Sequence, residues 1–190
     1  MPLTILVDAD ACPVKEEIYR VAQRHGVPVI LVANDWLRFP RGGLVSLQVV
    51  GKEFDAADSW IVDKCAELGE PPSAPGALSR QRSKASAIVI TADILLADAC
   101  LAKGAQVISP RGKIFDASNI GGAVAARNMA AERRDGVMNK SGELLQSKGG
   151  APAMSKADRS KFLEGLHLLL EREKRRQADA TTKRCACRAR

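Results

Sequence analysis

Short apolar runs rich in valine and isoleucine alternate along the chain with segments whose apolar residues recur at helical spacing. The runs are typical of strands buried on both faces of a parallel sheet, and the segments between them are typical of helices that cover it. This alternation predicts an α/β fold, a three-layer sandwich around a central and mainly parallel sheet. The expected strands are Leu3–Val7, Val27–Ala33, Leu44–Val50, Ala87–Thr91 and Ala105–Ser109.

Residues that start or stop helices mark the segments between these strands. Pro13 stands where a first helical position is expected, and Gly26 follows as a terminator, so together they frame the first helix. Gly69 and Gly104 close a second and a third helix in the same way. Residues 118–134 have helical composition, which predicts a fourth helix.

The last predicted helix has a clear start and one apolar face. Ser155 is followed three residues later by Asp158, which is the spacing of a capping box. The stripe beyond it suits packing on the sheet or contact with a second copy of the chain in a homo-oligomer. Its members are Phe162, Leu163, Leu166, Leu169 and Leu170.

Several segments lack apolar periodicity. Residues 70–86 contain three prolines, so we expect a loop insertion there, and residues 136–153 read as a second loop. Residues 111–115 are expected to be a short connection. From residue 171 the chain is polar and basic, which predicts a disordered tail over 171–190. We therefore expect one domain over residues 1–170.

The net charge of +7 is unevenly distributed. Residues 1–110 contain 11 basic and 13 acidic side chains, whereas residues 111–190 contain 18 basic and 9 acidic ones. An acidic front half and a basic back half suit a metal site beside a bound polyanion, although a solvated helix face is the alternative explanation for any single cation. The candidates for contact with nucleic acid are Lys15, Arg111, Lys113, Arg127, Lys156 and Arg159.

Cysteines and apolar runs bear on the cellular compartment. The five cysteines are odd in number and scattered, so we expect reduced thiols in the cytoplasm rather than a disulfide framework. No run approaches the ~18 apolar residues of a membrane span, and we expect no membrane association. Cys12 precedes a helix, where it is either an activated nucleophile or a buried structural thiol. His25 and His167 are isolated in the sequence and give weak evidence for zinc.

Two aspartates follow the first predicted strand. Asp8 and Asp10 have i, i+2 spacing, which directs both side chains to the same side of an extended chain. In an open parallel sheet, ligands bind outside the carboxyl ends of the strands, and this is such an end. The alternative is that one of the two caps the helix beginning near Pro13, which leaves the other unexplained.

Further aspartates follow the third and fourth predicted strands. Asp55 and Asp58 share one face at the start of the second helix, where a cap is a good explanation of Asp55. Asp58 lies one turn inside, among apolar residues, where an unpaired carboxylate is costly to desolvate. Asp93 enters the third helix either as its cap or as one more carboxylate at the sheet edge, and Asp98 lies five residues further on.

Three strand-to-helix junctions thus bring carboxylates to one edge of the sheet. Clustered carboxylates repel each other unless a cation lies among them, and oxygen ligands of this kind suit Mg²⁺ or Mn²⁺. Such an ion could activate a water for hydrolysis of a phosphodiester. The residues expected to be catalytic and to bind the metal are Asp8, Asp10, Asp58 and Asp93, with Asp55 and Asp98 as alternate metal ligands.

Two other functions fit the same residues. A nucleic-acid-binding or regulatory module could keep these acids without catalysing any reaction. The sequence Asp8-Ala-Asp10 also has the form of the nucleophile motif of haloacid-dehalogenase phosphatases. That class needs a Thr or Ser on a second strand and a distant lysine, and neither stands out.

Five blocks of sequence, taken together, resemble the bacterial YaiI/YqxD family over about residues 2–170. They are VDADACPVK (7–15), FDAADSWIV (54–62), VITADILLA (89–97), KGAQVISPRGKIFDASNI (103–120) and SKADRSKFLEGL (155–166). The family has no settled biochemical function and resembles a divergent branch of the PIN-like fold. The resemblance implies a PIN-like architecture. By analogy with PIN-domain ribonucleases, it also implies RNA as a better substrate candidate than DNA and metal-binding acids at Asp8, at Asp58 or Asp55, and at Asp93.

Overall fold

A six-stranded sheet forms the centre of the molecule. The computed structural model describes residues 3–10, 12–41, 43–51, 53, 55–69, 87–135 and 153–188, with side chains described only to residue 132 in the fourth helix and to residue 176 in the fifth. The predicted insertion at 70–86, the loop at 136–152, and the side chains of Cys185 and Cys187 therefore lie outside what is described. The strands are β1 Thr4–Asp8, β2 Val29–Ala33, β3 Val45–Val49, β4 Ala87–Ile90, β5 Gln106–Ile108 and β6 Ile114–Phe115.

The strands follow the order β3-β2-β1-β4-β5-β6, and all neighbours are parallel except β5 and β6. Within β1, β2 and β4 nearly every residue is buried, which explains why these runs are apolar throughout instead of alternating. The strand order reverses between β1 and β4, because β2 and β3 extend from one side of β1 and β4 and β5 from the other.

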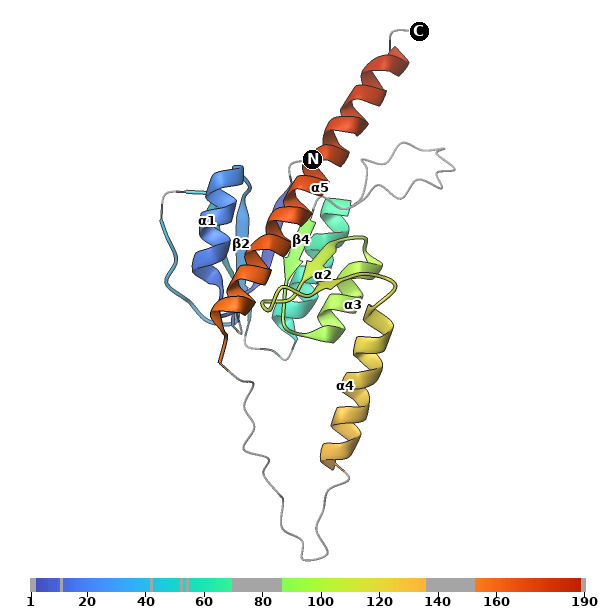
Figure 1. Cartoon of the computed structure of the whole chain (residues 1–190). Coiled ribbons are helices and arrows are strands. Elements are labelled where there is room, and N and C mark those ends of the chain that lie inside the picture. The colour runs from blue at the N-terminus through green and yellow to red at the C-terminus, as the bar shows by residue number, and fades with distance from the viewer. Residues whose placement is uncertain are drawn as a thin grey trace, which may run out of the picture.

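Within the described ranges, five helices are present, and helices lie on both faces of the sheet (Figure 1). Helices α1 and α5 lie side by side on one face, whereas α2 and α3 lie on the other and α4 packs beside α3. The predicted α/β three-layer architecture with a mainly parallel sheet is confirmed. The helices are α1 Lys15–His25, α2 Ala56–Gly69, α3 Ile94–Ala102, α4 Ile120–Asp135 and α5 Lys156–Arg188.

Each face of the sheet has its own apolar core. On the α1 and α5 side, Phe162, Leu166 and Leu170 are fully buried, so the stripe of the last helix packs on this chain's own sheet. On the other side, Ile61 of α2 and Cys100 of α3 are fully buried against the sheet. Because the sheet covers the apolar stripe, the stripe no longer argues for a homo-oligomer.

Two segments differ from the sequence prediction. The expected connection at 111–115 contains β6, which pairs antiparallel with β5. Helix α5 continues to Arg188, so the backbone of 171–188 is helical where the sequence predicts a disordered tail. A polar, basic composition does not itself end a helix. Glu173 is 3% exposed and accepts a hydrogen bond from Gln106 of β5, which holds α5 on the sheet at this point.

The turn between β5 and β6 depends on a glycine. Gly112 has a φ of 81°, and a Cβ at this position would lie 2.6 Å from the backbone carbonyl carbon of Lys161 in α5. Only glycine permits both the left-handed backbone and the close approach. The contact fixes the first turns of α5 beside the carboxyl ends of the strands.

No helix within the described ranges combines the length and the apolar content needed to span a bilayer.

Candidate metal centre at the carboxyl edge of the sheet

The reversal of strand order places Asp8 next to Thr91. Val7 of β1 pairs with Ile90 of β4, so the following residues, Asp8 and Thr91, also lie opposite each other. The Thr91 hydroxyl donates a hydrogen bond of 3.0 Å to Oδ2 of Asp8. In open α/β sheets the crevice at such a reversal is the usual place for a ligand. Asp8 is half-buried there.

Asp93 is the N-cap of α3. Its Oδ1 accepts hydrogen bonds from the backbone amides of Leu95 (2.6 Å) and Leu96 (3.3 Å). Its own backbone amide donates to the Thr91 hydroxyl over 2.9 Å. Thr91 therefore joins the turn that carries Asp93 to the carboxylate of Asp8. The capping explanation left open by the sequence is correct for one oxygen of Asp93, and Oδ2 takes no part in the cap.

Asp10 is exposed, and its Oδ2 accepts a hydrogen bond of 3.1 Å from the backbone amide of Asn34. Helix α1 begins at Lys15, and its N-cap residue, Val14, makes no side-chain cap hydrogen bond. Asp8 accepts hydrogen bonds from Thr91 and from the backbone of Asp10, and Asp10 accepts one from Asn34, so neither aspartate is the N-cap residue of α1. Asp10 instead ties the end of β1 to the segment after β2.

Asp55 and Asp58 stand at the start of α2. Asp55 has a φ of 59° and is the one non-glycine residue of the described chain with a positive φ. Aspartate tolerates this conformation better than most residues, and such outliers are frequent at functional sites. Asp58 lies in the first turn and is half-buried. Within the described residues its carboxylate has no hydrogen-bond donor.

The pKa values show that these carboxyls affect one another. Burial raises the pKa of Asp58 to about 6, and the charges of Asp8, Asp93 and Asp55 contribute to that rise. Burial also raises the pKa of Asp8, as do the charges of Asp10 and Asp93, while the hydrogen bond from Thr91 opposes the shift. Acids from β1, α2 and the β4–α3 turn thus form one electrostatic group.

Asp98 is separate from this group. It is exposed on α3, and its charge is not among those that raise the pKa of Asp8 or Asp58. The aspartates are also widely spaced. Among the described residues, no three aspartates have carboxylate oxygens that lie within 4.8 Å of one another, whereas ligand atoms of His25, His167 and Glu171 do.

One of the basic candidates has a structural role. The guanidinium of Arg159 donates a hydrogen bond to Glu17, a buried residue of α1. Arg111 lies 3.7 Å from Asp158, and Lys113 lies over the ring of Phe115 at 5.1 Å from its centroid. Lys156 is exposed at the start of α5. Arg111 and Lys113 lie in the turn that follows β5, so they are on the carboxyl edge of the parallel sheet, two strands away from Asp8.

Lys15 and Arg127 are both half-buried, on α1 and α4 respectively. Lys15 lies close enough to Cys12 for its charge to lower the pKa of the thiol, and Asp8 opposes that effect. Lys15 therefore shares the edge with Asp8. Arg127 lies on α4, the helix packed outside α3.

Cys12 is 7% exposed and belongs to the core between α1 and the sheet. Burial raises the pKa of its thiol to about 11. A thiol with this pKa is protonated at neutral pH and is a poor nucleophile. The structural explanation of Cys12 therefore holds.

Thr91 is a functional residue of this edge that sequence reasoning missed. In the sequence it stands at the end of a predicted strand. The sequence Thr91-Ala-Asp93 contained a signal for this role. A hydroxyl at the end of one strand lies next to the residue that pairs with it on the neighbouring strand, which here is Asp8 of β1. Finding that neighbour required the strand order, which the sequence does not contain.

Comparison with known proteins agrees with the resemblance inferred from the sequence. The family model described as "Uncharacterized BCR, YaiI/YqxD family" matches residues 6–68 and 79–172. A UPF0178 protein of Sphingopyxis alaskensis is 47% identical over 171 residues, which cover 90% of this chain and 95% of that protein. One from Agrobacterium fabrum is 46% identical with the same coverage.

A solved structure is also similar, though distantly. The crystal structure of a mutant of Rae1 (YacP) from Bacillus subtilis matches with a TM-score of 0.35 and 20% identity. The match covers 70% of this chain and 81% of that chain.

Proposed function

The chain belongs to the bacterial YaiI/YqxD family, and we propose that it is a metal-dependent nuclease that hydrolyses phosphodiester bonds, with RNA as its substrate. The observation that carries this proposal is the carboxyl group of Asp58. Its pKa of about 6 reflects burial and three neighbouring acids, Asp8, Asp93 and Asp55. Acids that are held together despite their burial and their mutual repulsion are typical of a functional site.

The donor set fits Mg²⁺ or Mn²⁺. All the clustered groups are carboxylates, which are the oxygen ligands that these ions prefer. The wide spacing is compatible with Mg²⁺, which keeps several of its waters and needs only one or two carboxylates directly. Among the described residues, the carboxylate of Asp58 and Oδ2 of Asp93 accept no hydrogen bond, so they are available to an ion. Asp8 and Asp58 would hold the ion, with Asp93 beside them.

Each residue has a defined task in this proposal. A bound ion would lower the pKa of a water and stabilise the charge that develops on the phosphate. Thr91 positions Asp8 through its hydroxyl. Asp10, fixed by the backbone of Asn34, adds negative charge beside Asp8 and so strengthens its attraction for a cation. In this proposal the bound ion, and not a side-chain base, would activate the water, because the carboxylates would be engaged in holding the ion.

The substrate class follows from the charges around this edge. Lys113 and Lys156 are exposed at the same edge, and Lys15 lies beside the acids. Such cations can hold a phosphate backbone without reading its sequence. RNA is preferred to DNA on the resemblance to PIN-domain ribonucleases. Arg159 contributes less than the sequence suggested, because Glu17 neutralises it.

A phosphatase of the haloacid-dehalogenase kind is less well supported. That mechanism needs a hydroxyl free to bind the phosphate. The Thr91 hydroxyl already donates to Asp8 and accepts from the amide of Asp93. Trapping of a phosphorylated Asp8 after incubation with a phosphomonoester would favour the phosphatase over the nuclease.

The decisive experiment compares variants on labelled single-stranded RNA and DNA, with Mn²⁺, with Mg²⁺ and with a chelator. Asp8→Asn and Asp58→Asn should each lower the cleavage rate by about a hundredfold or more, which is the usual effect of removing a catalytic group. Asp63→Asn is the matched control, because Asp63 is exposed on the same helix α2 and should keep the parent rate. Intact RNA with the parent protein and both metals would refute the nuclease.

One refuting result has a meaning of its own. If the parent and Asp8→Asn bind RNA equally, with an affinity that falls steeply with salt and with no cleavage, the chain is a nucleic-acid-binding module.

A further inference from the structure

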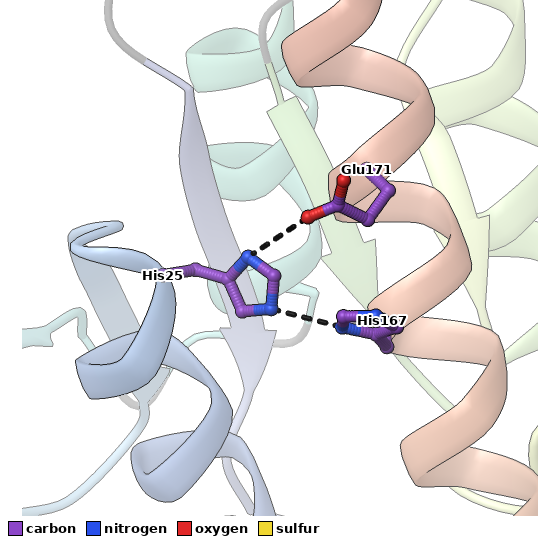
Figure 2. Close-up of side chains that lie close together, drawn as sticks. All are labelled: His25, His167 and Glu171. Atoms are coloured by element: carbon purple, nitrogen blue, oxygen red, sulfur yellow. Dashed lines mark hydrogen bonds and ion pairs between the residues drawn. The ribbon is translucent and has the colours of Figure 1, made fainter.

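His25, His167 and Glu171 meet between the end of α1 and the middle of α5 (Figure 2). Nε2 of His25 lies 2.9 Å from Nδ1 of His167, and Nδ1 of His25 lies 3.6 Å from Oε1 of Glu171. Figure 2 shows the imidazole of His25 pointing from α1 toward the two side chains of α5. The His25 side chain is 5% exposed, whereas Glu171 keeps 40% of its side chain exposed.

Rigid elements hold the three side chains. His25 is the last residue of α1, and Gly26 closes that helix in the left-handed conformation, with its amide directed at the carbonyls of Ala22 and Gln23. His167 and Glu171 are four residues apart, so they share one face of α5. The opposite face of α5 is anchored in the core, which fixes where these two side chains can reach.

The two imidazoles share a single proton. A neutral imidazole has one donor and one acceptor nitrogen. Lys174, which can only donate, lies 3.1 Å from Nδ1 of His25 and donates to the His25 carbonyl over 3.0 Å. Nδ1 of His25 therefore accepts a hydrogen bond from Lys174, and Nε2 of His25 carries the ring proton and donates it to Nδ1 of His167.

We propose that His25, His167 and Glu171 bind a divalent transition-metal ion of the Zn²⁺ type, which joins α1 to α5. The three ligand atoms already lie within 4.8 Å of one another. Two imidazoles and one carboxylate are a common ligand set for Zn²⁺, and a water completes the coordination. Imidazole ligands select Zn²⁺, Ni²⁺ or Cu²⁺ against Mg²⁺, so this site differs in metal class from the aspartate group.

Lys174 is the competitor for this site. When an ion takes the place of the shared proton at Nε2, the proton of His25 moves to Nδ1. Nδ1 then donates, so the ammonium of Lys174 becomes an unfavourable neighbour. Lys174 must therefore move away when the ion binds. Removing its charge should tighten binding, an effect that nonspecific binding to surface histidines would not produce.

The experiment uses Co²⁺ as a spectroscopic probe and Zn²⁺ as its competitor. The full chain carries Cys185→Ser and Cys187→Ser, because thiols in the tail also bind these ions. With an excess of Mg²⁺ present to occupy the aspartate group, we expect one Co²⁺ per chain, with visible absorption bands typical of nitrogen and oxygen ligands, and displacement by Zn²⁺. His167→Gln and His25→Asn should each weaken binding by at least about tenfold, and Lys174→Met should tighten it. Circular dichroism checks that each variant is folded.

Two results would overturn the proposal. One is Co²⁺ binding that His167→Gln and Glu171→Gln leave unchanged. The other is an ultraviolet thiolate-to-cobalt band, which would place the ion on a cysteine. Cleavage of RNA with Mn²⁺, measured on the same variants, should not change, so failure of this site and failure of the nuclease are separate results.

Discussion

Thr91 connects two of the acids at the carboxyl edge of the sheet. Its hydroxyl donates to Asp8 and accepts from the amide of Asp93, so a single side chain links the ends of β1 and β4. The hydrogen bond to Asp8 also opposes the effect of burial on the pKa of that carboxyl. A small change at Thr91 should therefore affect metal binding without removing any ligand.

Replacing Thr91 by valine tests this role. Thr91→Val keeps the shape but loses the hydroxyl, so the pKa of Asp8 should rise further and protons should compete better with the metal. We expect the affinity for Mn²⁺ at neutral pH to fall by about tenfold, as is usual when a residue that supports a ligand is lost. Thr91→Ser retains the hydroxyl and is the matched control. Titration calorimetry gives both affinities, and equal values for valine and serine would disprove the role.

The raised pKa of Asp58 predicts how stability depends on pH. Its folded value of about 6 exceeds the ordinary 3.8, so the folded state holds this proton more tightly than the unfolded state does. The resulting stabilisation is complete below pH 3.8 and is lost as the pH rises through about 6. With a chelator at neutral pH, Asp58→Asn should therefore stabilise the protein by roughly 1 kcal/mol after solvent screening. Thermal melts at neutral and acidic pH measure this difference, which should vanish in acid.

The pairing of α1 with α5 is an element-scale feature that carries charge as well as apolar contact. Glu17 in the first turn of α1 is buried, and Arg159 of α5 donates to its Oε1. Its Oε2 is buried without a hydrogen-bond donor among the described residues. A buried carboxylate that depends on one partner makes that partner structurally important.

Arg159→Ala should therefore destabilise the fold instead of only weakening nucleic-acid binding. We expect a loss of about 2 kcal/mol, below the value for a fully buried pair because Arg159 is partly exposed. Adding Glu17→Gln should recover part of the loss, since no buried charge then remains unpaired. Lys156→Ala, at an exposed position of the same helix, should leave stability unchanged. Urea unfolding gives all three values, and equal effects of the two alanine variants would contradict the prediction.

The elements themselves were largely predictable from the sequence. All five predicted strands exist, and the capping box is present, with Ser155 and Asp158 bonded to each other. Local chemistry determines such features, so a local pattern reveals them. The short strand β6 and the length of α5 were missed, because a two-residue strand and a polar helix have no apolar period.

At the scale of the whole molecule, only some contacts between distant segments could be predicted from the sequence. The aspartates were predicted to gather because all parallel strands end at one edge. His25 and His167 are 142 residues apart, and nothing in the order of the elements brings them together. Their meeting depends on how α5 lies beside α1. The four-residue spacing of His167 and Glu171 was the one local signal, and it is common on helices.

The two proposed metal sites lie at opposite ends of α1. Its 11 residues separate the acid edge from His25 by about 16 Å at the usual rise of a helix. Sites this far apart, with no shared ligand, should contribute independently to stability. Each ion at about a hundred times its dissociation constant should stabilise the fold by about 2.7 kcal/mol, and the two stabilisations should add. Asp58→Asn should remove only the effect of Mn²⁺, and His167→Gln only that of Zn²⁺. Thermal melts with each ion and with both test this, and loss of both effects in either variant would show that the two ions share one site.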